Sequence, residues 1–302
     1  MVFRLSEALV DVLQGIDQKA QRMDIIGVSG VLRGILSLVV FCVTLVITQA
    51  LAWAILAMGI ATYAVVLLYD WPRAHQLTPF GGALDRKKIL RLLGQCWPLM
   101  LNSIFLTSVV SIPRNNLEWI CSATVLGYYS SVATPAVIVQ TASSWLYNPL
   151  ILPLTTYYQN REKQPFLLLI GKVLIALIGV FILIIAGAAL LGRWALQLLF
   201  GSAILPYAYL LIPVLITTMM IALSWFLGTL LIIARRLKTL LLANAVAMGI
   251  SIALSAPLIR QFQMDGVNYV VYLAMGVSLV IQIAVLWWKC SRHFANQQEQ
   301  TP

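Results

Sequence analysis

Two arginines have the type and positions that would suit binding of an anionic ligand, and a glutamate near one of them is a further candidate to contact it. Arg33 lies inside a long apolar run, about eight residues or roughly 12 Å of helix from its nearer end. Arg114 and Glu118 follow Pro113 closely, with the spacing of neighbours on one helix face. A charge at membrane depth is costly unless it faces protein or water, and guanidinium groups bind phosphate oxygens bidentately. We therefore expect these three residues to contact substrate in a cavity. The alternatives are Arg33 bonded to backbone carbonyls and an Arg114–Glu118 ion pair.

Three amide side chains also lie within apolar segments. Asn102, Gln140 and Asn148 are candidate substrate-binding residues, although a hydrogen bond between helices is the more ordinary role of each. Gly30 and Gly34, on either side of Arg33, have the small-xxx-small spacing that lets another helix approach closely.

Motifs for catalysis or cofactor binding are absent from the sequence. It has no GxxxxGK[ST], HExxH or GxSxG, and its 4 cysteines and 2 histidines do not have the spacing of metal ligands. The carboxylates are expected in loops or at the membrane interface, with none deep in a span. We expect no catalytic residues, no metal and no cofactor, and therefore a protein that is not an enzyme.

Composition identifies the class of protein that must position these residues. Of 302 residues, 61% are hydrophobic and 10% are charged, which excludes an ordinary soluble domain. The apolar runs are about 20 residues or longer, as membrane-spanning helices require. The net charge of +10 is typical of basic cytoplasmic loops and does not indicate a nucleic-acid partner. The sequence predicts an all-α integral membrane protein with membrane lipids around it.

Hydropathy predicts about eight transmembrane helices. Their expected ranges are 25–48, 50–69, 95–113, 123–156, 166–190, 205–233, 237–259 and 267–288. Segment 123–156 contains three prolines, so one kinked helix and two short helices are both open from its sequence.

Charge asymmetry favours the single helix and predicts both termini in the cytoplasm. With eight spans, the inner loops hold 15 of the loop Lys and Arg residues, and the outer loops hold only Arg114, Arg193 and Arg260. The longest outer loop is expected at 191–204. We therefore predict a multi-pass protein of the cell inner membrane.

A basic segment divides the chain into unequal parts. Residues 70–93 have prolines, a glycine pair and a run of basic residues, and we expect them to form a cytoplasmic linker. Before it lie an amphipathic N-terminus and two spans (1–69). After it lie six spans (94–289) and a cytoplasmic tail (290–302).

Two stretches resemble a known family of membrane proteins. Residues 97–139 read WPLMLNSIFLTSVVSIPRNNLEWICSATVLGYYSSVATPAVIV, with Pro98, a Pro-Arg pair before Glu118, and an LGYYSS turn. Residues 15–34 read GIDQKAQRMDIIGVSGVLRG. These patterns resemble the polysaccharide flippases, often called Wzx-type, of the multidrug/oligosaccharidyl-lipid/polysaccharide exporter superfamily.

The resemblance implies a fold and a function. Members of the family have two six-helix lobes, so this chain would hold one complete lobe and the last two helices of a first lobe that lacks four. The implied activity is translocation of a polyprenyl-diphosphate-linked oligosaccharide, an O-antigen or capsular repeat unit, from the cytoplasmic to the outer leaflet for lipopolysaccharide or exopolysaccharide biosynthesis. A polysaccharide polymerase and other assembly proteins would be its partners.

Three other readings remain open from the sequence. One is a related exporter of drugs or peptidoglycan precursors, which deep carboxylates would favour. Another is a membrane enzyme acting on lipid-linked sugars, although such proteins usually carry larger outer loops. The third is a truncated remnant that does not transport.

Overall fold

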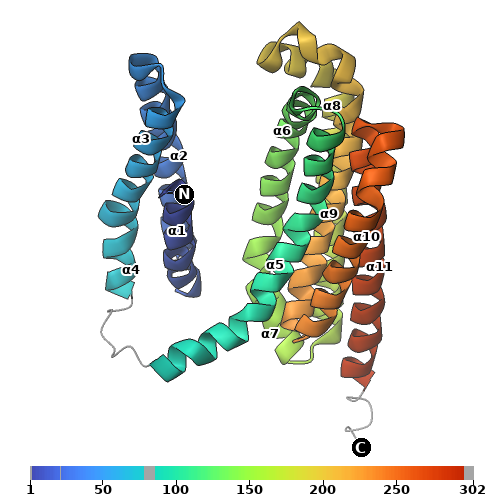
Figure 1. Cartoon of the computed structure of the whole chain (residues 1–302). Helices are drawn as coiled ribbons and strands as arrows, with labels where there is room; N and C mark the ends of the chain where they lie inside the picture. The colour runs from blue at the N-terminus through green and yellow to red at the C-terminus, as the bar shows by residue number, and fades with distance from the viewer. Residues whose placement is uncertain (1, 21, 78–85, 296–302) are drawn as a thin grey trace, which may run out of the picture. The chain divides into compact units, whose positions relative to one another are not determined.

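A computed structural model describes residues 2–20, 22–77 and 86–295 (Figure 1). Every regular element in these ranges is helical. Seven of the helical segments are long and apolar enough to cross a membrane, which confirms the all-helical membrane class. They are Asp24–Thr48, Leu51–Leu77, Cys96–Ile120, Lys163–Phe200, Ser202–Ile233, Leu237–Phe262 and Met264–Trp288.

The chain folds as two compact units, Met1–Lys88 and Ile89–Pro302. Residues 78–85 of the expected linker and 296–302 of the expected tail lie outside the described residues. The rest of that linker is helical, because α4 covers Trp71–Leu77 and α5 begins at Arg86.

Unit 1 is a helical hairpin with an amphipathic helix packed on it. Helix α2 (Met23–Thr48) and helix α3 (Leu51–Val65) form the hairpin. A π-helical turn, η1 (Val66–Asp70), joins α3 to α4 without a break. Helix α1 (Val2–Lys19) packs against α2, α3, η1 and α4. The second predicted span therefore continues past residue 69 to Leu77.

Unit 2 begins with a long helix, α5 (Arg86–Ile120), which crosses the boundary between the units. It contains Pro98 and Pro113, and Figure 1 shows it changing direction along its length, as prolines within helices commonly cause. The third span, expected at 95–113, is longer than predicted, because the helix continues for seven residues past Pro113 to Ile120.

The proline-rich segment 123–156 forms one long helix followed by a short one. Helix α6 (Ala123–Tyr147) runs through Pro135, and a 3₁₀ turn, η2 (Asn148–Leu150), leads into α7 (Ile151–Gln159). Numerous serines and threonines lower the hydropathy of α6, and it is not among the seven candidate spans.

Four further helical segments complete unit 2. They are α8 (Lys163–Phe200), α9 (Leu211–Ile233) after the 3₁₀ segment η3 (Ser202–Leu210), α10 (Leu237–Phe262) and α11 (Met264–Ala295). The outer loop expected at 191–204 is wrong for residues 191–200, because α8 extends to Phe200.

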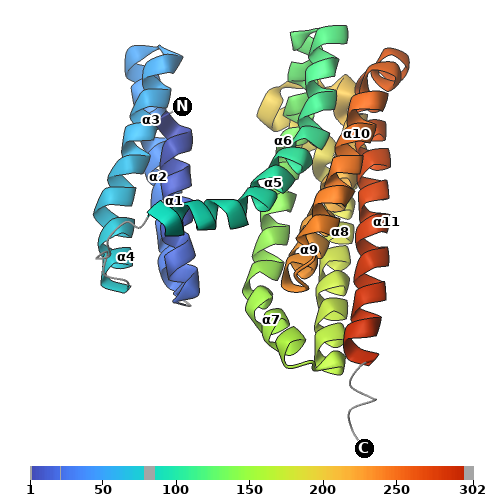
Figure 2. The ribbon, with the colours of Figure 1, turned by 60° about the horizontal axis from the view of Figure 1, so that its bottom comes forward.

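Helix α9 forms the centre of unit 2. It packs against α6, α7, α8, α10 and α11 (Figure 2). Most of its apolar side chains are buried. Large apolar side chains on α8, such as Leu183 and Leu190, are by contrast exposed, as expected where a helix contacts lipid. Polar side chains on the helices around α9 therefore either point to lipid or meet one another in the bundle.

Candidate functional site: a polar cavity in the second unit

A chain of hydrogen bonds joins four helices of unit 2. The Asn244 side-chain amide of α10 donates to Asn102 Oδ1 of α5 over 2.7 Å. The Ser278 hydroxyl of α11 donates to Asn244 Oδ1 over 2.9 Å. The Gln282 amide, one turn later on α11, donates to Ser278 Oγ and to Ser224 Oγ of α9, each over 3.0 Å.

This chain is buried in an otherwise apolar bundle. Asn244, Ser278 and Gln282 are each at most 1% exposed. An amide or hydroxyl without a partner in such surroundings costs about 1–3 kcal/mol, so the shared hydrogen bonds offset most of the cost of burial. The Gln282 Oε1 atom is buried and lacks a partner, which leaves one acceptor of the network free.

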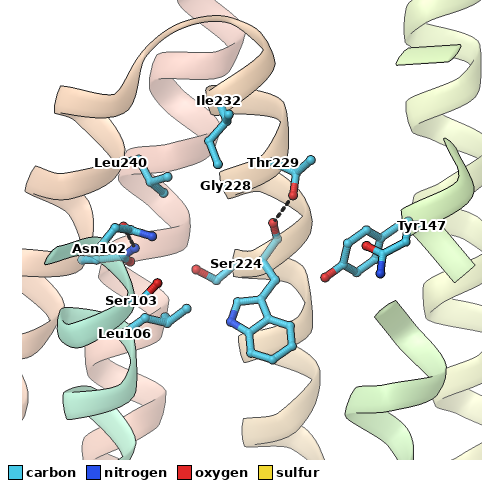
Figure 3. Close-up of a pocket in the computed structure, with 12 residues that line it drawn as sticks. Asn102, Ser103, Leu106, Tyr147, Ser224, Gly228, Thr229, Ile232 and Leu240 are labelled. Carbon is cyan, nitrogen blue, oxygen red and sulfur yellow. Dashed lines mark hydrogen bonds between the residues drawn. The ribbon is translucent and has the colours of Figure 1, made fainter. Parts of the chain in front are cut away.

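A cavity of about 240 Å³ adjoins the network (Figure 3). Figure 3 shows Asn102 and Leu240 on one side of it, Tyr147 on the other, and Ser224 between them. Trp225 supplies a second aromatic ring, and its backbone carbonyl accepts a hydrogen bond from the Thr229 hydroxyl over 3.0 Å. None of the described residues that line the cavity is charged.

Local packing holds the aromatic wall in place. Tyr147 is the last residue of α6, and its ring packs on Phe226 with 5.8 Å between centroids. The helix breaks at Asn148, whose side chain also lines the cavity. Gly228 allows α9 and α10 to approach, because a Cβ atom there would lie 3.3 Å from Leu240 Cδ1.

Amides, hydroxyls and two aromatic faces give this cavity the chemistry of a site for a neutral, hydroxyl-rich group. Amide and hydroxyl side chains both donate and accept hydrogen bonds, as sugar hydroxyls do. A small number of placed polar groups among apolar walls is the usual composition of a ligand site.

Arg114 belongs to a separate cluster near the far end of α5. Its guanidinium carbon lies 5.8 Å from the centre of the Tyr129 ring, and Tyr129 donates a hydrogen bond to Asn268 Oδ1 over 2.9 Å. Arg114 Nε and Asn268 Nδ2 are both buried without a partner. Two free donors in one cluster would suit an acceptor oxygen of a ligand.

The other predicted site residues are dispersed. Within the described part of the chain no ion pair joins Arg114 to Glu118, which is exposed. Gln140 is half-buried on α6 and does not line the cavity, whereas Asn102 and Asn148 both line it. Arg33 belongs to unit 1, where its Nε is buried without a partner.

One prediction about the carboxylates is wrong. Asp70 is 1% exposed and lies within the second candidate span, not in a loop. The reason is that the π-helical turn carries the helix beyond residue 69, so Asp70 faces the interior of unit 1. Arg33 of α2 is the charged group that acts on it.

Several residues of the cavity and of the adjoining hydrogen-bond network were not predicted from the sequence. Ser278 and Gln282 are spaced i,i+4 in an apolar run, which puts both on one helix face and was a usable signal. Asn244 was a similar polar residue within a predicted span. Ser224 carried no signal of its own, because single serines are common in membrane helices.

Comparisons with models of protein families, with curated proteins and with solved structures find no match to this chain.

Proposed function

We propose that this chain is a multi-pass inner-membrane transporter of the polysaccharide flippase type. Its substrate would be a polyprenyl-diphosphate-linked oligosaccharide, moved from the cytoplasmic to the outer leaflet for assembly of surface polysaccharide. The observation that carries the proposal is the uncharged cavity of unit 2, which adjoins a buried hydrogen-bond network and has Tyr147 and Trp225 in its wall. A site built to bond hydroxyl groups discriminates strongly against ligands that lack them.

Charged residues outside this cavity would serve the diphosphate. The Arg114 and Asn268 cluster offers two unpartnered donors, and guanidinium groups bind phosphate oxygens in pairs. Arg33 is a second candidate for the same role in unit 1. In this proposal, neutral polar side chains bind the sugar and arginines bind the diphosphate.

Helix α6 is the proposed eighth span. Its 25 residues give about 37 Å of helix, enough to cross the hydrocarbon core of roughly 30 Å. Its polar side chains include Ser143, which is buried and donates to its own backbone, at Val139 O. Eight spans would put both termini in the cytoplasm, in agreement with the charge asymmetry of the loops.

Binding to the full chain in lipid nanodiscs tests the proposal. We expect a polyprenyl diphosphate that carries an oligosaccharide to bind more tightly than the same lipid without sugar. Trp225→Ala should weaken binding of the glycosylated lipid about tenfold, equivalent to about 1.4 kcal/mol, and leave the bare lipid unaffected. Trp145→Ala is the matched control, because Trp145 is 73% exposed on α6. Equal affinity of the wild-type chain for both lipids would refute the proposal.

Asp70 favours a second candidate, a cation-coupled drug exporter of the same superfamily. A buried carboxylate in a membrane span is the feature that such an exporter requires, and unit 1 contains one. This alternative predicts that a lipophilic organic cation binds the chain and that Asp70→Asn abolishes the binding, with the glycosylated lipid showing no preference.

A further inference from the structure

The amphipathic helix α1 buries a carboxylate along with its apolar face. Val10, Leu13 and Asp17 follow one another at helical spacing, and all three are at most 4% exposed. Val10 and Leu13 pack against Val66 and Ala74 of the second span. Asp17 therefore continues a packed apolar stripe, where a charged side chain would be costly.

Asp70 lies at the end of the π-helical turn that faces α1. It is 1% exposed, and neither of its carboxylate oxygens has a hydrogen-bond partner. A π-helical turn inserts an extra residue into a helix and is frequent at functional sites. The turn η1 thus directs a carboxylate into the interface between α1 and the hairpin.

Helix α2 completes the cluster with a hydroxyl and a cation one turn apart. The Ser29 hydroxyl lies beside Asp70, but its Oγ is fully buried and makes no hydrogen bond of good geometry. Arg33 is the charged group that acts most strongly on Asp70. The Asp70 carboxylate oxygens, Ser29 Oγ and Arg33 Nε are thus all buried atoms without a hydrogen-bond partner.

The other charged groups around Asp17 have contacts elsewhere. Arg22 makes an exposed ion pair with Asp24, with 2.9 Å between Nη2 and Oδ2. The Arg73 guanidinium of α4 stacks on the Tyr69 ring, with its carbon 3.6 Å from the ring centre. Their influence on Asp17 is weaker than that of burial and of Asp70.

Cations compensate the two buried carboxyl groups only in part. The half-buried Arg33 acts on Asp70, whereas Arg22 and Arg73 act on Asp17 more weakly than Asp70 does. Two neighbouring buried carboxyl groups cannot both ionise cheaply, and one of them then keeps its proton.

We propose that Asp17 and Asp70 form a binding site for one exchangeable proton, and that this proton keeps α1 docked on the α2–α4 hairpin. The inference goes beyond the proposed transport function and concerns unit 1 alone. When the proton leaves, two buried carboxylates repel each other, and undocking α1 moves Asp17 into water.

The cluster suits a proton better than a metal ion. Metal ions that prefer oxygen take six or more ligands, whereas this cluster offers two carboxylates and one hydroxyl. Arg33 places a fixed positive charge at Asp70, which disfavours a cation at that carboxylate. A proton needs no coordination shell, so it can reside on Asp17, farther from the guanidinium.

The sign of the pH dependence follows from Asp17, which lies outside the membrane-spanning segments. Burial and then the nearby Asp70 carboxylate raise the pKa of Asp17 above its ordinary value. The docked state consequently binds more protons than the undocked state. Docking is therefore most stable at low pH and weakens as the pH rises through the raised pKa.

Hydrogen exchange of α1 amides tests the proposal on the full chain in nanodiscs. Protection factors would be measured from about pH 5 to about pH 9. Because each factor is a ratio to the intrinsic exchange rate, the intrinsic pH dependence of exchange cancels. We expect protection of α1 to fall at least tenfold with rising pH, while protection of α10 stays constant. Asp17→Asn, in a helix outside the spans, should abolish the fall. Asp70→Asn removes the repulsion but leaves Asp17 buried, so the fall should remain and shift to lower pH.

Two further variants separate this site from ordinary packing. Asp11→Asn removes an exposed carboxylate from the same helix and should retain the wild-type pH profile. Arg33→Gln removes the competing positive charge and should shift the midpoint to higher pH, a change that a purely structural role would not produce. The proposal is overturned by a wild-type profile without pH dependence, by an Asp17→Asn variant that keeps the fall, or by an unshifted midpoint in Asp70→Asn or Arg33→Gln. Protection of α1 that is higher in Na⁺ buffer than in choline buffer would identify a metal-ion site and would overturn the proton site.

Discussion

Arg33 and Arg114 share one unusual property at the scale of the single residue. Each has a buried Nε without a hydrogen-bond partner, although an arginine offers five donors and normally uses them. The depth of Arg33 in its span predicts that it faces protein or water, because an arginine facing lipid is costly. The sequence could not identify Asp70 or Asn268 as neighbours of the two arginines, because these lie on other helices and only the packing of those helices brings them close.

Arg114 should bind the diphosphate of the proposed substrate. Arg114→Ala should weaken binding of polyprenyl diphosphate to the full chain by about tenfold, or about 1.4 kcal/mol. Arg114→Lys should recover only part of the affinity, because an ammonium cannot bond two oxygens in the planar arrangement of a guanidinium. Equilibrium binding in nanodiscs measures both.

Arg260 provides the control for this prediction. It is exposed in the last turn of α10, so Arg260→Ala removes the same charge without affecting the Tyr129 and Asn268 cluster. Equal losses in Arg114→Ala and Arg260→Ala would show that general surface charge, and not the cluster, attracts the lipid.

At the scale of elements, helix positions were easier to predict than helix lengths. The apolar runs correctly located α2, α10 and α11, because each ends near a polar turn. Helices α5 and α8 are longer than predicted, since a helix does not stop where its hydropathy falls. The π-helical turn before Asp70 left no signal in the sequence, because its residues VLLYD continue an ordinary helical pattern.

The junction between α10 and α11 depends on a glycine. A Cβ atom on Gly266 would lie 2.5 Å from the backbone oxygen of Leu258, and a backbone atom cannot move aside as a flexible side chain can. Gly266→Ala should therefore separate the two helices and destabilise unit 2 by about 1–3 kcal/mol, the usual cost of overpacking. Thermal unfolding of the purified chain measures the loss.

Gly249 is the matched control on α10, because a Cβ atom there would meet no atom within 4 Å. Gly249→Ala should be neutral or stabilise the chain by up to about 1 kcal/mol through helix propensity. A melting temperature unchanged by Gly266→Ala would show that the helices do not approach as closely as the structure indicates.

At the scale of the whole molecule, composition identified the class because 61% hydrophobic residues cannot be hidden in a soluble fold of 302 residues. The cavity of unit 2 could be predicted from the sequence only in part. Asn102 and Asn148 were recognised as candidates, yet their common cavity arises from the packing of α5, α6 and α9. Orientation in the membrane follows from loop charges and is testable independently of function.

Two cysteines at opposite ends of one span make that test direct. Cys96 begins the candidate span of α5, and Cys121 follows its last residue, so 25 residues or about 37 Å of helix separate them. Cys96 is exposed and Cys121 is half-buried, so a thiol reagent can reach both. The charge asymmetry predicts Cys121 outside and Cys96 inside.

In chains that retain one of these cysteines and have the others changed to Ser, an impermeant reagent added to intact cells should label Cys121 alone. Cys96 should react only after the membrane is opened, which also controls for its intrinsic reactivity. Labelling of Cys96 in intact cells would place the basic residues of α5 outside and reverse the orientation proposed for every helix of the unit.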